Sequence, residues 1–123
     1  MVNQQIIGGQ DTRLSPEDLA ELRANLLEQR LFREEQLRQI AAVPSRADDR
    51  LERCSAARTE VRVKLAASAR MVLADVEAAL DRMDAGRYGS CHLCRRPIAR
   101  ERLMIVPQAR YCARCQQVRE AGR

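Results

Sequence analysis

Aromatic residues are almost absent from this chain of 123 residues, which has no Trp, one Phe and two Tyr. The core of a large globular domain is normally filled partly by aromatic side chains, so their scarcity argues against such a domain. Charged residues make up 32% of the chain, and Ala, Arg, Leu and Glu dominate its middle. With apolar residues at helical spacing, that mixture is typical of long helices or a coiled coil.

The sequence also lacks the features of a secreted or membrane protein. Residues 1–9 contain no basic segment followed by an apolar run, so a secretory signal is not expected. No apolar stretch approaches the roughly 18 residues that a membrane-spanning helix needs. We therefore expect a cytoplasmic protein, in which paired cysteines are more often metal ligands than disulfides.

The net charge does not by itself identify a partner. It is formally +5, which is compatible with binding to nucleic acid or to an acidic protein surface. However, acidic residues are interspersed among the basic ones, and no block of like charges forms a basic tail.

A helix start is the first strong local signal, after a polar segment (1–13) that we expect to be a flexible tail. Ser15 suits the N-cap, because its hydroxyl can accept a hydrogen bond from a free backbone N–H. Pro16 suits the first helical position, and Asp18 lies near the positive end of the helix dipole. A helix is therefore predicted from Pro16 to about Ala42.

A second helix is predicted beyond the break at Val43-Pro44-Ser45. It should begin between Ser45 and Arg50 and end near Asp84, where Ala85-Gly86 gives a C-terminal signal. Apolar residues spaced by three and four mark one face of each helix: Leu19, Leu22, Leu26, Leu37 and Ile40 in the first, and Val61, Leu65, Ala69, Val72, Val76, Leu80 and Met83 in the second.

The two apolar faces and the short connection predict an antiparallel hairpin over residues 14–85, with its tip at 43–51. The alternative is one broken helix without pairing. It is less favourable, because an unpaired amphipathic helix leaves its apolar face in water.

Two pairs of cysteines carry the strongest chemical signal. Cys91 and Cys94 form one C-x-x-C pair, Cys112 and Cys115 form another, and seventeen residues separate the pairs. This spacing is typical of a four-cysteine zinc site, because each tight pair supplies two thiolates to a tetrahedral ion. Four thiolates leave no open position for water, so the predicted zinc is structural rather than catalytic.

Other residues near the cysteines receive simpler interpretations. His92 is the only histidine and is expected to be exposed, and Cys54 is expected to be a free thiol of the second helix. Between the cysteine pairs, residues 95–111 are expected to form a small ribbon, and residues 116–120 a short helix. The apolar residues expected to cover the zinc and dock on the hairpin are Ile98, Leu103, Ile105 and Val106.

The residues around the cysteines resemble the zinc-finger signature of the DksA/TraR family. The matching positions are Gly86, Tyr88, Gly89, Cys91, Cys94, Ile98, Arg102, Leu103, Pro107, Cys112 and Cys115. The resemblance is close over residues 86–116, and the order of hairpin and then finger (86–123) also agrees with the family. It implies a mainly α fold in which a two-helix coiled coil precedes the finger and a short C-terminal helix follows.

The resemblance implies a transcription regulator that binds bacterial RNA polymerase directly and inserts its coiled-coil tip into the secondary channel. Some members act with the alarmone ppGpp, but this sequence has no phosphate-cradling Gly-rich loop, so we do not assign a ppGpp site. Well-known members carry an Asp-x-x-Asp-x-Ala motif at the tip. Here one aspartate and the alanine are missing, and the candidate tip residues are Arg46, Asp48, Asp49 and Leu51. The two aspartates suit either the tip function or capping of the second helix.

Three other functions compete with this one. A nucleic-acid-binding zinc module is suggested by the arginines of the finger: Arg95, Arg96, Arg100, Arg102, Arg110 and Arg114. A coiled-coil dimerisation module is the second. An enzyme is the least favoured, since no nucleophile–base pair or open metal site is visible.

Overall fold

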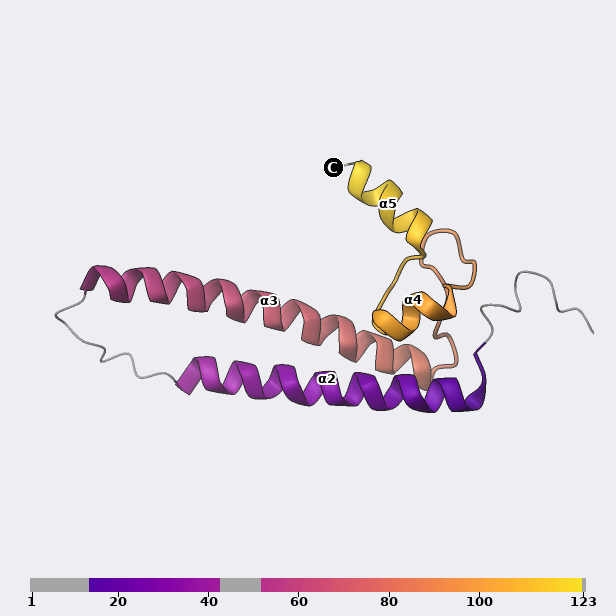
Figure 1. The fold of residues 1–123 in the computed structure, drawn as a ribbon, viewed down its shortest axis with the longest axis horizontal. Coiled ribbons are helices and arrows are strands. Elements are labelled where there is room, and N and C mark those ends of the chain that lie inside the picture. Colours follow the sequence, from indigo (N-terminus) through magenta and orange to yellow (C-terminus); the bar gives the residue numbers. More distant parts are fainter. Residues whose placement is uncertain (1–13, 43–51, 123) are drawn as a thin grey trace, which may run out of the picture.

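The computed structural model describes residues 14–42 and 52–122, and this part of the chain is mainly α-helical (Figure 1). Its helices are α2 (Pro16–Ala42), α3 (Glu52–Asp84), α4 (Arg100–Ile105) and α5 (Ala113–Ala121). Over these two ranges the only β pairing is an isolated antiparallel bridge between Ser90 and Pro97. The predicted fold class is confirmed. None of the described helices is both long and apolar enough to cross a membrane.

Helices α2 and α3 lie side by side and antiparallel, as predicted for a hairpin (Figure 1). They contain 27 and 33 residues, so they are about 40 Å and about 50 Å long. The alternative of a broken, unpaired helix is therefore wrong. The predicted tail (1–13), the tip (43–51) and the predicted start of the second helix lie outside the described residues.

A reciprocal pair of hydrogen bonds begins α2. The backbone N–H of Asp18 donates to Ser15 Oγ at 2.9 Å, and the backbone N–H of Ser15 donates to Asp18 Oδ2 at 3.1 Å. The predicted N-cap is thus confirmed, with Asp18 completing a capping box. Asp18 also accepts from Arg100 Nη2 at 3.0 Å. The hydrogen bonds from Arg100 and from the Ser15 backbone lower the pKa of Asp18 to about 2.

Gly86 ends α3 in the way the sequence predicts. Its φ of 74° is left-handed, which favours glycine because a Cβ is disfavoured there. The Gly86 N–H donates to Met83 O at 3.1 Å, and the Arg87 N–H donates to Arg82 O at 2.8 Å. These two bonds form a Schellman motif, which satisfies the last carbonyls of the helix and turns the chain away from the hairpin.

Two buried clusters hold the described residues together. One lies between α2 and α3 and contains Leu26, Val76, Ala79 and Leu80. The other joins the base of the hairpin to the segment that follows, and its buried residues are Leu22, Cys91, Ile98, Leu103 and Ala109. Leu22 and Leu26, one helical turn apart, are both fully buried but belong to different clusters.

The predicted apolar face of α3 does not stay buried toward the tip. Val61 and Leu65 of α3 are 55% and 47% exposed, whereas Ala69 and Val76 further along are buried. In the corresponding half of α2, Gln29, Arg30 and Arg33 interrupt the apolar spacing, which leaves less apolar surface to pair with. Val61 and Leu65, which the sequence places on the apolar face of the second helix, are therefore not buried by the hairpin.

Replacing Leu26 with alanine should lower the free energy of unfolding by about 2–5 kcal/mol, because it opens a cavity in the cluster between α2 and α3. Leu31→Ala is the matched control, since Leu31 lies on the same helix and is 64% exposed. The control should change stability by less than about 0.5 kcal/mol. Urea unfolding followed by circular dichroism measures both, and equal losses would contradict the assigned core.

Ser15→Ala should cost about 1 kcal/mol of stability, because it leaves the Asp18 N–H without its side-chain acceptor. Ser68→Ala, at an exposed position of α3, removes the same hydroxyl without removing a cap. Thermal unfolding of the two variants should show a loss for Ser15→Ala alone. An unchanged melting temperature for both would remove the capping box as a source of stability.

Candidate metal centre

The four cysteines of the predicted site come together in the structure. The sulfur atoms of Cys91, Cys94, Cys112 and Cys115 all lie within 4.8 Å of one another. The Sγ atoms of Cys94 and Cys112 are 3.9 Å apart. A tetrahedral zinc ion with bonds of about 2.3 Å places its sulfur ligands about 3.8 Å apart. The geometry therefore fits one structural zinc ion, as the sequence predicts.

A tight backbone turn presents the first two sulfurs. The Cys91 N–H donates to Arg96 O at 2.8 Å, and the Arg95 N–H donates to Cys91 O at 3.0 Å. Within this turn the Leu93 N–H points at Cys91 Sγ, at 3.4 Å. Arg95 has a φ of 65°, a left-handed conformation that costs a residue other than glycine on the order of 1 kcal/mol.

The start of α5 presents the other two sulfurs. Cys112 is its N-cap, and Cys112 Sγ accepts from the Cys115 N–H at 3.4 Å. The positive end of the helix dipole favours a thiolate at this position. The predicted C-terminal helix is confirmed, and because it starts at Ala113 it positions Cys115 in its first turn.

The four thiols differ in how readily they lose their protons. Burial raises the pKa of Cys91, but backbone hydrogen bonds from Cys94, Cys112 and Leu93 outweigh burial and lower it to about 6. Burial and hydrogen bonds with the other three thiols raise the pKa of Cys115 to about 12. One thiol therefore ionises easily and another resists, chiefly because burial disfavours its charged form. A metal ion binds thiolates and so favours the loss of their protons.

The finger docks on the hairpin through a few apolar side chains. Ile98 and Leu103 are buried together with Leu22 of α2, as predicted. The Tyr88 hydroxyl donates to Pro107 O at 2.7 Å, and burial raises the pKa of Tyr88 to about 12. Ile105, which was expected to cover the zinc and dock on the hairpin, is instead 80% exposed.

The ribbon predicted for residues 95–111 is wrong. Residues 100–105 form α4, and pairing within the finger is limited to the Ser90–Pro97 bridge. Five of the six residues in α4 are Arg, Glu, Leu or Met, which are strong helix formers. The helix also places Leu103 against the hairpin, where it is buried with Leu22 of α2.

Three of the finger arginines are engaged within the protein. Arg100 pairs with Asp18 at 3.0 Å and Arg110 pairs with Asp75 at 2.7 Å, so both join the finger to the hairpin. Arg102 Nε donates to Tyr111 O at 2.9 Å. Sequence reasoning did not find these roles, because the acidic partners lie 82 and 35 residues away in the chain.

Arg82 of α3 is a further residue that the sequence did not single out. It is buried, and its pKa is lowered by that burial and by the nearby Arg110. Its burial could have been predicted from its position three residues after Ala79, on the apolar side of the helix.

His92 is exposed, as expected. The predicted tip residues Arg46, Asp48, Asp49 and Leu51 lie outside the described residues, and Cys54 belongs to α3, distant in sequence from the four ligands.

Known proteins share this finger and this fold. Residues 86–121 match the family described as prokaryotic dksA/traR C4-type zinc finger. An uncharacterized protein of Aquifex aeolicus (strain VF5) is 38% identical over 52 residues, which are 41% of this chain and 36% of that protein. The chain thus spans little more than a third of this relative.

A solved structure extends the likeness beyond the finger. It is the structure of transcription factor DksA2 from Pseudomonas aeruginosa, with a TM-score of 0.70 and 22% identity over 87% of this chain and 86% of that chain. At this identity the comparison shows that the hairpin and the finger have the same fold in both proteins.

Removing the zinc, by a chelator or by Cys94→Ala, should unfold residues 86–121 and spare much of the hairpin. The reason is that Leu26, Val76, Ala79 and Leu80 form a cluster separate from the finger. Circular dichroism should show a partial loss of helicity, with Cys54→Ala as the control that removes a thiol outside the metal site. Complete loss of helicity in the zinc-free protein would contradict this separation.

Proposed function

We propose, from the match of residues 86–121 to the dksA/traR C4-type zinc finger family, that the protein is a bacterial transcription regulator that binds RNA polymerase directly. In this proposal the hairpin enters the secondary channel with its tip foremost, and the finger stays at its base. The protein acts in the cytoplasm, where its proposed partner works, and by binding rather than by catalysis.

The shape of the hairpin is the observation that carries the proposal. Helix α3 is about 50 Å long, and the finger packs only at the end where α2 begins and α3 ends (Figure 1). The other described helix ends, at Ala42 and Glu52, lie apart from the finger (Figure 1). A long, narrow pair of helices held at its base by a zinc finger is suited to enter a channel of a large protein.

The acidic residues of the tip give the proposal a chemical basis. Asp48 and Asp49 come between the two helices in the sequence. Carboxylates are preferred ligands of hard cations such as the Mg²⁺ of a polymerase active site. If Asp49 takes the place of the motif's second aspartate, Arg46 and Leu51 stand where the family has the first aspartate and the alanine. If Asp48 takes that place, Ser45 and Arg50 stand there instead. We therefore propose an altered tip, whose action at the polymerase differs from that of members with both aspartates.

The alternative of a nucleic-acid-binding module receives less support from the structure. Arg100, Arg102 and Arg110 form bonds within the protein. The other finger arginines, Arg95, Arg96 and Arg114, are exposed. With half of the six arginines committed to internal bonds, fewer remain to contact phosphates, so we do not propose DNA binding. The exposed Val61 and Leu65 of α3 suit a dimerisation surface as well as the wall of a channel, so they do not favour dimerisation. Among the described residues, no feature adds support for an enzyme.

Purified core RNA polymerase from bacteria should retain the wild-type protein in co-purification. The double variant Asp48→Ala/Asp49→Ala should still bind but should lose its effect on transcription in vitro, because the finger and the helix sides remain while the tip carboxylates are gone. Glu21→Ala/Glu28→Ala is the matched control, since it removes two exposed carboxylates of α2 outside the tip.

The outcomes separate binding from action. If the wild-type protein does not bind the polymerase, the proposed partner is wrong. If it binds and the tip variant regulates transcription as well as the control does, the protein acts through another surface. A DNA-binding module would instead bind duplex DNA alone, with an affinity that falls steeply as salt is added.

A further inference from the structure

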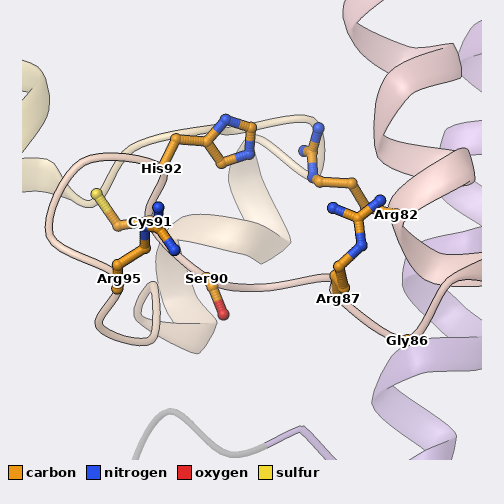
Figure 2. Close-up of a pocket in the computed structure, with 7 residues that line it drawn as sticks. All are labelled: Arg82, Gly86, Arg87, Ser90, Cys91, His92 and Arg95. Carbon is orange, nitrogen blue, oxygen red and sulfur yellow. The ribbon is translucent and has the colours of Figure 1, made fainter.

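A basic cavity lies between the end of α3 and the first pair of cysteines. Its volume is about 580 Å³, and arginines 82, 87 and 95 line it together with His92 and Cys91. In Figure 2 the side chain of Arg82 extends from α3 toward the His92 ring, Arg87 rises from the loop that follows the helix, and Arg95 lies at the opposite end beside Cys91. No acidic side chain is among the lining residues.

Arg82 is the buried cation of this cavity. Its residue is 8% exposed, yet no ion pair to it is formed by the described residues. Its hydrogen bond in this part of the chain is a long one, from Nη2 to Ala109 O at 3.5 Å. The negative charge of Asp75 also acts on Arg82, but that carboxylate is paired with Arg110 at 2.7 Å. A buried guanidinium that has no anion of its own is costly, so its presence beside a cavity calls for a partner.

Arg95 supports the same interpretation from a different observation. It occupies a left-handed backbone position with a φ of 65°, where glycine would be free of strain. An arginine is therefore kept at a position where its backbone is disfavoured, and its side chain lines the cavity. Strained residues that persist in a structure commonly have a functional role.

We propose that this cavity binds a small molecule bearing a multivalent oxyanion, such as inorganic phosphate or a phosphate monoester. Guanidinium groups present paired N–H donors that match phosphate oxygens. Three arginines from α3, the loop after it and the first cysteine turn supply three positive charges. A single carboxylate neutralises one of these, whereas a phosphate group neutralises nearly two and has more acceptor oxygens.

The zinc site is not the anionic partner of the arginines in this cavity. Zinc with four thiolates has a formal charge of about −2, and Cys91 is one of the lining residues. However, the Cys91 sulfur already accepts a backbone N–H from Leu93, and Arg82 donates to the backbone oxygen of Ala109 rather than to any of the four sulfurs. This inference also goes beyond the proposed regulator, because anion binding by the isolated protein does not require the polymerase.

Titration of the zinc-loaded full chain with inorganic phosphate tests the proposal by isothermal calorimetry. The wild type should bind one phosphate per chain in a saturable way. Arg82→Gln should weaken binding about tenfold or more, the effect of losing a charged hydrogen-bond donor. Arg95→Gly should weaken binding similarly without lowering the melting temperature, since glycine suits this backbone position.

Arg70→Gln is the control, because it removes an exposed arginine from the same helix as Arg82. It should leave phosphate affinity unchanged, and zinc content and circular dichroism establish that each variant is folded. Absence of saturable phosphate binding by the wild type overturns the proposal, as does unchanged affinity in Arg95→Gly or an equal loss in Arg70→Gln.

Two further results would assign the arginines to other roles and also overturn the proposal. If Arg82→Gln lowers zinc affinity while phosphate does not bind, the arginines serve the charge of the metal site. If duplex DNA binds in an Arg95-dependent way and phosphate neither binds nor competes, the cavity belongs to a nucleic-acid surface.

Discussion

Coordination of one zinc ion by four sulfurs is the interaction on which the finger depends. The segment from 86 to 121 buries few large apolar side chains, chiefly Ile98 and Leu103. Burial on that scale does not offset the conformational entropy of ordering a segment of this length. Metal binding supplies the difference, because the ligands come together only in the folded state and the binding free energy becomes folding free energy. The backbone N–H groups directed at Cys91 and Cys112 prepare the thiolates for the ion.

The metal-held finger is joined to the hairpin by contacts that differ in kind. Leu22 of α2 is buried against Ile98 and Leu103. Around this apolar contact, Asp18 and Asp75 pair with arginines of the finger. Apolar contact is non-directional, whereas the ion pairs fix which faces meet. The consequence for function is geometric: the orientation of the hairpin relative to the finger is set at its base, a helix length away from the proposed acting tip.

Arginine serves three distinct purposes in a small volume. Arg100 and Arg110 join the finger to the hairpin, Arg102 holds the backbone ahead of the second cysteine pair, and Arg82 stays without an anion in a buried position. The first two uses explain why the basic character of the finger is a poor guide to DNA binding. Only the structure points to the role of Arg82, because a buried cation without an ion pair is unfavourable unless an anion neutralises it.

Local chemistry in the sequence determined the helix limits at Pro16, Ala42 and Asp84, the capping by Ser15, and the four zinc ligands. These features depend on near neighbours and on ligand spacing, which the sequence displays directly. Tertiary structure alone decided that Val61 and Leu65, in the half of α3 nearer the tip, stay exposed and that Arg82 is buried. Those outcomes depend on which surfaces meet across the chain, and residues 82 positions apart, such as Asp18 and Arg100, carry no mark of their pairing until the fold brings them together.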